Sequence, residues 1–289
     1  MSNAIIYVFS GSGNTKRVAK EFARHFEADG VETTLVDIKK GQNYPSPLRY
    51  DVVIVAHPVH GFNAPTTVFD FVKQLPQGDG RLVYIVETSG EPLKLNDGAH
   101  LAVRNRLRRK GYGFGGYLRY VMPYNIIFRH SDGMAVRLWQ AAQKQISLDY
   151  PMILAGEEWK TFTSPWTKLV NAVVRIEHPA MPVIGRGFKS TDQCIGCGKC
   201  ERVCPQQNIV IKDGRPVFGK NCVGCMGCAF SCPKDAIRTG ILNSWRVNGA
   251  YPTEGTPCTD EEICSYWKGV YRRYFHAIED QDVPPVMDK

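Results

Sequence analysis

Short runs of β-branched and aromatic residues alternate with amphipathic stretches along the first half of the chain. Five such runs predict strands, at residues 4–9, 33–37, 51–56, 81–86 and 116–122. Apolar residues at helical spacing predict helices between and after them, at residues 16–26, 66–75, 98–110 and 133–148. This alternation favours an α/β fold with a doubly wound, five-stranded parallel sheet that is covered by helices on both faces.

Three polar loops leave the carboxyl ends of these predicted strands, where a doubly wound sheet binds its ligands. They are residues 10–15 after the first strand, 57–63 after the third and 87–91 after the fourth. The first loop reads Ser10-Gly-Ser-Gly-Asn-Thr15 and opens a predicted helix. Its glycines allow a phosphate to approach the backbone, and its hydroxyl and N–H groups at the helix start are donors to that phosphate.

Three kinds of phosphate loop contain such glycines, and neighbouring residues distinguish them. A Walker loop would need a Gly-Lys-Ser/Thr sequence, which Lys16-Arg17 does not supply. A dinucleotide fingerprint would need a third glycine where Lys16 stands. The loop instead resembles the Thr/Ser-x-Thr/Ser-Gly-Asn-Thr loop of flavodoxins, in which neutral donors hold the phosphate of FMN. This resemblance extends over residues 1–150.

The resemblance to flavodoxins implies a set of FMN-binding residues in the three loops. They are Ser10, Gly11, Ser12, Gly13, Asn14 and Thr15 around the phosphate, and Pro58, His60, Gly61, Phe62, Asn63, Thr88, Ser89 and Gly90 around the ring. The second loop departs from the family, because it has His60 and Phe62 where flavodoxins usually have Trp and Tyr. The third loop contains Pro92 and has no aromatic residue near it. We expect His60 or Phe62 to touch the flavin, with an aromatic that only closes the domain edge as the alternative, and His57 to be structural.

Two runs of cysteines near the carboxyl end follow one pattern, C-x2-C-x2-C-x3-C-P. Their cysteines are Cys194, Cys197, Cys200 and Cys204 in the first run, and Cys222, Cys225, Cys228 and Cys232 in the second. Structural zinc and disulfide frameworks also use closely spaced cysteines, but neither explains two copies of one pattern. The pattern resembles that of bacterial ferredoxins with two [4Fe–4S] clusters, and the resemblance covers residues 188–240.

In such ferredoxins the fourth cysteine of each run binds the other cluster. The two ligand sets that the resemblance implies are Cys194, Cys197, Cys200 and Cys232 for one cluster, and Cys222, Cys225, Cys228 and Cys204 for the other. Between the runs, residues 209–211 and 216–218 flank Asp213-Gly214 and predict a hairpin. Residues 188–240 are therefore expected to form a small α+β, ferredoxin-like domain that transfers single electrons.

The connector, residues 151–187, predicts an amphipathic helix. Ser164-Pro165 is a helix start, and apolar residues follow at positions 166, 169, 170, 173 and 174. We expect this apolar stripe to pack between the two domains, with contact to a membrane surface as the alternative.

The carboxyl-terminal extension, residues 241–289, predicts a second amphipathic helix. Thr259 and Glu262 form a capping box ahead of an apolar stripe at residues 263–275, which indicates a helix docked on the body. Cys258 and Cys264 lie outside the cluster motifs. We interpret them as free thiols, with a redox pair or a reactive thiol as the alternative.

Composition bounds the class of protein and its expected location. The chain has 289 residues, of which 43% are hydrophobic and 22% charged, which suits two soluble domains. No window approaches the roughly 20 apolar residues needed to cross a bilayer, and no basic region with an apolar signal core opens the chain. We therefore expect no membrane span. Because thiolates that bind iron need reducing conditions, we expect a cytoplasmic location.

Positive charge is the other compositional feature, with a formal net of +8. Residues 189–239 hold eight Lys/Arg against four Asp/Glu, which offsets part of the negative charge of bound clusters. A basic cluster is formed by Arg104, Arg106, Arg108, Arg109 and Lys110. We interpret it as a solvated helix face, with docking of an acidic electron donor as the alternative. No nucleic-acid-binding module accompanies the charge, so no nucleic acid is expected.

The two resemblances together match the fused flavodoxin-like and ferredoxin-like proteins common in anaerobic bacteria and archaea, and Met122-Pro-x-Asn125 after the fifth strand fits that group. They imply two [4Fe–4S] clusters that exchange single electrons with FMN, in a carrier that relays low-potential electrons to a partner oxidoreductase. Two alternatives stay open. One is a reductase acting on its own small substrate, with His60, Glu87 or Glu91 as the proton donor, and the other is a redox sensor.

Overall fold

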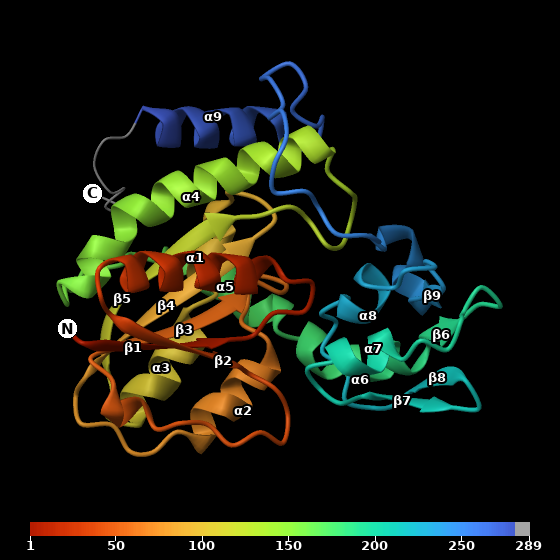
Figure 1. Ribbon diagram of the computed structural model, residues 1–289, viewed down its shortest axis with the longest axis horizontal. Helices are drawn as coiled ribbons and strands as arrows, with labels where there is room; N and C mark the ends of the chain where they lie inside the picture. The colour runs from red at the N-terminus through yellow and green to blue at the C-terminus, as the bar shows by residue number, and fades with distance from the viewer. Residues whose placement is uncertain (281–289) are drawn as a thin grey trace.

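The computed structural model describes residues 1–280, and residues 281–289 of the predicted extension lie outside the described residues. Its centre is a five-stranded sheet in the order β2-β1-β3-β4-β5, with all neighbours parallel (Figure 1). The strands are β1 (Asn3–Val8), β2 (Glu32–Asp37), β3 (Val52–Pro58), β4 (Leu82–Ser89) and β5 (Gly113–Val121). This is the flavodoxin-like order, and the predicted fold class is confirmed.

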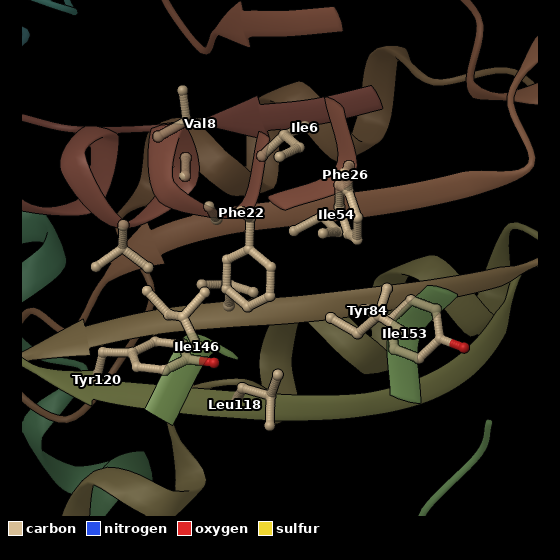
Figure 2. Packing of buried hydrophobic residues seen from close by; sticks show 14 of the residues in the cluster. Ile6, Val8, Phe22, Phe26, Ile54, Tyr84, Leu118, Tyr120, Ile146 and Ile153 are labelled. Atoms are coloured by element: carbon tan, nitrogen blue, oxygen red, sulfur yellow. The ribbon is translucent and has the colours of Figure 1, made fainter. Parts of the chain in front are cut away.

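Helices cover both faces of this sheet. They are α1 (Asn14–Ala28) and α4 (Asp132–Leu154) on one face, and α2 (Thr66–Gln74) and α3 (Leu101–Arg109) on the other (Figure 1). Because successive strand residues point to opposite faces, β1 sends Ile6 and Val8 into one core and Ile5 and Tyr7 into the other. Figure 2 shows the core on the α1 side, where each fully buried apolar side chain contributes about 1.5–3 kcal/mol.

Several elements differ from their predicted boundaries. The predicted helix at residues 98–110 is α3, which begins at Leu101, and a 3-10 helix, η2 (Lys94–Gly98), precedes it. At Gly98 the side chain of Asn171 leaves no room for a Cβ. α4 continues to Leu154, beyond the predicted end at residue 148. β5 begins at Gly113 rather than at residue 116, because glycines interrupt the apolar pattern of its first residues.

The two cysteine runs lie in a small lobe beside the sheet (Figure 1). Each run leads into a short helix, α7 (Lys199–Val203) or α8 (Gly227–Phe230). The predicted hairpin is present as β7 (Ile209–Lys212) and β8 (Arg215–Phe218), with Asp213 and Gly214 both at positive φ. A second antiparallel pair, β6 (Lys189–Ser190) and β9 (Ile237–Arg238), joins the two ends of the lobe.

The connector forms two helices, α5 (Pro165–Val174) and α6 (Glu177–Arg186). Ser164 caps α5 as predicted, because its Oγ accepts a hydrogen bond of 3.0 Å from the backbone N–H of Thr167.

The expected burial of the apolar stripe of α5 is wrong, because Trp166, Leu169 and Val173 are exposed. The helix buries its polar side instead. Asn171 donates to the carbonyl oxygens of Phe62 at 2.6 Å and Leu95 at 3.3 Å. Apolar spacing predicts an amphipathic helix, but here amide hydrogen bonds decide which side faces the sheet domain.

The carboxyl-terminal extension contains η3 (Gly240–Trp245) and α9 (Lys268–Glu279), and α9 lies along α4 (Figure 1). The helix begins later than predicted. The N–H of Thr259 donates to the Glu262 carboxylate at 2.7 Å, as in a capping box. Trp267 then adopts a left-handed conformation with φ of 58°, and the helix begins only after it. Cys258 is buried in the core between α4 and α9, and both Cys258 and Cys264 are free thiols. Within residues 1–280, no helix has the length and apolar character to cross a membrane.

Candidate functional site

A cavity of about 270 Å³ lies at the carboxyl edge of the sheet, where the loops after β1, β3 and β4 meet. The predicted FMN-binding residues on its wall are Ser10, Gly11, Ser12, Asn14, Thr15, Pro58, His60, Gly61, Phe62, Thr88, Ser89 and Gly90. Two predicted residues are not on this wall. Gly13 is exposed, and the Asn63 side chain donates to the carbonyl oxygens of Gly61 and Asn171.

The first loop turns tightly into α1. Gly13 makes this turn at φ of 102°, a left-handed conformation that favours glycine, and its N–H donates to Ser10 Oγ at 3.1 Å. The first backbone N–H groups of α1 have no acceptor within the helix, and the helix dipole makes this end positive. Lys16 pairs with Asp37 at 2.7 Å, and the first turn carries no acidic side chain. These features fit a phosphate that neutral donors hold.

Two hydroxyl groups of this loop have protein partners. Thr15 is buried, and its hydroxyl lies 2.7 Å from that of Thr88 in the third loop. Ser12 Oγ accepts a hydrogen bond of 2.9 Å from Asn125. A serine hydroxyl that accepts keeps its own proton to donate, so Ser12 can still donate to a ligand in the cavity. Thr15 instead ties the first loop to the third.

The second loop is closed by two backbone hydrogen bonds of 2.8 Å that His60 and Asn63 exchange. Between them Gly61 and Phe62 both have positive φ. Burial lowers the pKa of His60 to about 4, so its ring is neutral at pH 7. Glu177 of α6 packs against Gly61 so closely that no Cβ fits there. A neutral ring and a carboxyl group therefore stand beside this loop.

The third loop has no aromatic residue near it in the sequence, but the fold brings one to it. Tyr124, from the loop after β5, packs against Gly90 and leaves no room for a Cβ. Its hydroxyl donates to one oxygen of Glu91, and the other oxygen accepts a hydrogen bond of 3.0 Å from Asn96. Burial and the neighbouring Glu91 raise the pKa of Tyr124, which keeps its hydroxyl protonated. The loop sequence alone conceals this contact because Tyr124 and Glu91 are 33 residues apart.

Of the three candidate proton donors, His60 and Glu91 line the cavity and Glu87 does not. Glu87 is fully buried in the sheet, with a carboxylate oxygen 3.6 Å from Nε2 of the buried His57. Burial raises the pKa of Glu87 well above its ordinary value and lowers that of His57 to about 4. Burial therefore favours the uncharged form of both groups, and the pair lies in the core, away from the cavity.

The cysteines of the two runs surround two further cavities. One is lined by Cys194, Cys197, Cys200 and Cys232, and the other by Cys204, Cys222, Cys225 and Cys228. These are the two sets that the ferredoxin resemblance implies, with the fourth cysteine of each run on the other cavity. Gly196, Gly198 and Gly224 have positive φ and let the loops curl around the sulfur atoms. Four cysteines around each cavity fit a cubane cluster.

Backbone N–H groups contact two of these sulfur atoms, and burial acts on a third. Asn208 donates to Cys204 Sγ at 3.3 Å and Ala236 donates to Cys232 Sγ at 3.2 Å. Burial raises the pKa of Cys225 to about 12. Thiols in this environment stay protonated until iron binds, and cluster assembly releases their protons.

The cavity that contains Cys225 adjoins the cavity at the carboxyl edge of the sheet. Val223 lies on both walls. A Cβ on Gly11 of the phosphate loop would lie 2.6 Å from the carbonyl oxygen and 3.0 Å from Sγ of Cys225. Asn125 bridges the same gap, because its amide donates to Ser12 and, at 3.4 Å, to the Cys225 carbonyl. Cys197, on the other cysteine cavity, is exposed.

Residues beyond the three predicted loops complete the cavity at the carboxyl edge of the sheet. Tyr124 and Asn125 follow β5, Glu177 and Met181 come from α6, and Trp245 comes from η3. Only Asn125 had a signal, in the Met-Pro-x-Asn sequence after β5. Apolar spacing in the connector and the extension predicts helices. It does not reveal that the Glu177 carboxylate of the connector lines a cavity of the sheet domain.

Two family models match separate parts of the chain. One is described as a flavodoxin domain and matches residues 5–120, and the other is described as a 4Fe-4S dicluster domain and matches residues 193–237. No curated protein gives a significant match.

Solved flavodoxin structures also match the sheet domain. Two-electron reduced Megasphaera elsdenii flavodoxin is 23% identical, over 40% of this chain and 84% of that chain, with a TM-score of 0.34. Streptococcus pneumonia flavodoxin is 22% identical, over 42% of this chain and 84% of that chain, with a TM-score of 0.34. A flavodoxin from the domain Archaea is 15% identical, over 53% of this chain and 99% of that chain, with a TM-score of 0.34.

Proposed function

We propose that electrons pass singly through two [4Fe–4S] clusters to or from FMN. The chain joins a flavodoxin domain to a 4Fe–4S dicluster domain, as an iron–sulfur flavoprotein electron carrier does. The carrier would relay low-potential electrons to a partner oxidoreductase. The observation that supports this most is the backbone contact between Gly11 of the phosphate loop and Cys225 of the inner cysteine cavity.

The residues of the proposed FMN site have distinct tasks. The Ser10–Thr15 loop and the amino end of α1 would hold the phosphate, and Ser12 would donate to it. The second and third loops, with Tyr124 over Gly90, would flank the ring. FMN, when bound, supplies a group that exchanges electrons one at a time or in pairs.

The proposed order of centres runs from the surface inward. Cys197 is exposed, so the set that contains it would meet a partner protein. The Cys225 set is adjacent to the phosphate loop, so it would exchange electrons with the flavin. Asn125 ties Ser12 to the Cys225 carbonyl and holds this junction closed.

The proposed order of centres can be tested with an electron donor that is too large to enter the FMN cavity. Protein loaded with FMN and clusters is mixed under anaerobic conditions with a reduced small ferredoxin, and FMN absorbance is followed. We expect Cys197→Ala to slow FMN reduction by at least about tenfold, a difference of about 1.4 kcal/mol in the barrier. Cys264→Ala, outside the two sets, is the control. Equal rates for Cys197→Ala and the unaltered protein would contradict the relay.

A second candidate function, a reductase acting on its own small substrate, is favoured by Glu91 and Glu177. Both carboxyl groups line the FMN cavity. Burial raises the pKa of Glu177, which favours the protonated form of an acid that donates a proton. A panel of metabolites offered to the fully reduced protein separates the two functions. Turnover with a small molecule selects the reductase, whereas reoxidation only by a protein selects the carrier.

A further inference from the structure

A large apolar surface stands open on the connector. Its members on α5, α6 and the adjoining segments are Phe162, Trp166, Leu169, Val173, Ile176 and Val183, with exposed fractions of 56–76%. Ile241 and Trp245 of η3, which packs beside α6, are exposed as well. We call these eight residues the connector face. Large apolar side chains exposed together on neighbouring elements mark an interaction site.

The exposure is a consequence of how α5 is anchored. Its inward side is polar, with Thr167 and Asn171 buried. The Asn171 amide donates to backbone carbonyl groups on both sides of the helix, at Phe62 and Leu95. These contacts hold α5 with its apolar side outward.

Within residues 160–176 the charges have one sign. From residue 160 to residue 176 the chain has no Asp or Glu and has Lys160, Lys168 and Arg175. Lys168 and Arg175 also line a cavity of about 510 Å³ between α5 and α3. The other cationic residues of this cavity are Arg104, Arg106 and Arg109. Within the described part of the chain, none of these cavity cations forms an ion pair with Asp or Glu.

We propose that the connector face and this cationic cavity dock on an anionic lipid bilayer, as a peripheral contact. Exposed Trp, Phe and Leu beside unpaired Lys and Arg are the composition of a helix that lies in a bilayer interface. A second copy of the chain fits less well, because a symmetric contact would bring the unpaired cations toward one another. Trp245 and Glu177 also line the FMN cavity, so docking would hold that cavity near the membrane surface.

Co-sedimentation of the full, cofactor-loaded chain with vesicles tests the proposal. One set of vesicles is phosphatidylcholine alone, and the other is a mixture of phosphatidylcholine and phosphatidylserine. We expect binding to the mixed vesicles at least about tenfold tighter than to the neutral ones, and weaker as salt is raised. Equal binding to both, or binding to neither, overturns the proposal.

Two pairs of substitutions separate the apolar and the charged contributions. Trp166→Ser with Leu169→Ser should weaken binding to the mixed vesicles by at least about tenfold. The matched control is Val210→Ser with Val217→Ser, which removes exposed apolar side chains from the β7–β8 hairpin and should leave binding unchanged. Arg104→Gln with Arg109→Gln should reduce both the preference for phosphatidylserine and the salt dependence.

The oligomeric state of the free protein tests the alternative, that the connector face binds a second copy of the chain. Sedimentation of the free protein should give the same mass for the unaltered chain and for Trp166→Ser with Leu169→Ser. A dimer that this pair converts to a monomer, without a loss of vesicle binding, would assign the face to a second copy and overturn the proposal. FMN affinity serves as the check of folding, because all of these substitutions are outside the cavity wall.

Discussion

At the scale of single residues, the surroundings of each carboxyl group decide what it can do. Glu91 accepts hydrogen bonds from Tyr124 and Asn96, which fixes its orientation. Glu177 lines the same cavity and has no hydrogen-bond or ion-pair partner in the described chain. Asp149 is buried in α4 and accepts a hydrogen bond of 2.7 Å from Tyr120. Glu177 gives a prediction about the FMN midpoint potential, and Asp149 gives one about stability.

Replacing Glu177 with Gln should change how the FMN midpoint potential depends on pH. Burial raises the pKa of Glu177, and negative charge that arrives with an electron raises it further. Between these two pKa values the potential should fall with rising pH, by up to about 59 mV per unit for one electron and one proton. Glu177→Gln should lose this slope, whereas the exposed Glu158→Gln should keep it. Redox titrations at several pH values measure it, and equal slopes would remove Glu177 from the site.

Replacing Asp149 with Asn should flatten the dependence of stability on pH. Burial raises the pKa of Asp149 from 3.8 to about 7, so the folded state binds a proton that the unfolded state releases. Its contribution is therefore present below the unfolded pKa and is lost as pH rises from about 4 to 7, by at most about 4 kcal/mol.

Thermal unfolding across this pH range checks the Asp149 prediction. The unaltered protein should lose stability toward neutral pH relative to Asp149→Asn, while the exposed Glu254→Gln should follow the unaltered protein. Parallel curves for the unaltered protein and Asp149→Asn would contradict the assignment.

At the scale of elements, apolar periodicity predicted which segments are strands and helices better than it predicted where they face. The strands β1, β3 and β4 were visible because each is buried on both faces and therefore mostly apolar. The orientation of α5 was not, because Asn171 decides it through partners in other segments. The late start of α9 depends on the left-handed conformation of Trp267, which a capping-box pattern does not reveal.

The crossing of the cysteine runs is a prediction at this scale. Cys204 follows the first run but lies on the cavity of Cys222, Cys225 and Cys228. Cys204→Ala should therefore damage that cluster and leave the cluster of the first run largely intact. Electron paramagnetic resonance of the reduced protein distinguishes the two clusters, and Cys258→Ala is a control that should keep both. Selective loss of the other cluster would show that the runs do not cross.

At the scale of the whole molecule, the contact between the two halves carries the proposed electron path. Gly11→Ala would place a Cβ 2.6 Å from the Cys225 carbonyl oxygen, so the phosphate loop and the cysteine loop would have to separate. We expect FMN reduction through the clusters to slow by at least about tenfold, while both cofactor types remain. Gly269→Ala, in α9 with open space around it, is the control. Unchanged rates in Gly11→Ala, measured by rapid mixing, would show that the path does not cross this contact.

The candidate site was visible in sequence only where one segment carries a whole pattern. The Ser10–Thr15 loop and the cysteine runs are such patterns, and the structure brings their predicted residues, except Gly13, to cavity walls. Tyr124, Glu177 and Trp245 reach the FMN cavity from three separate segments. Their positions follow from how the domains pack, and no local spacing encodes that packing.

The close approach of Gly11 to Cys225 also has a thermodynamic consequence. One loop would touch both the FMN phosphate and a cysteine of the inner set, so each ligand would order backbone that the other needs. Binding free energies that share such a segment are coupled, and the coupling is reciprocal. Cluster loss should then weaken FMN affinity by the same factor by which FMN release loosens the cluster. Oxidative damage that removes a cluster from the cysteine lobe would therefore also favour the loss of FMN from the sheet domain.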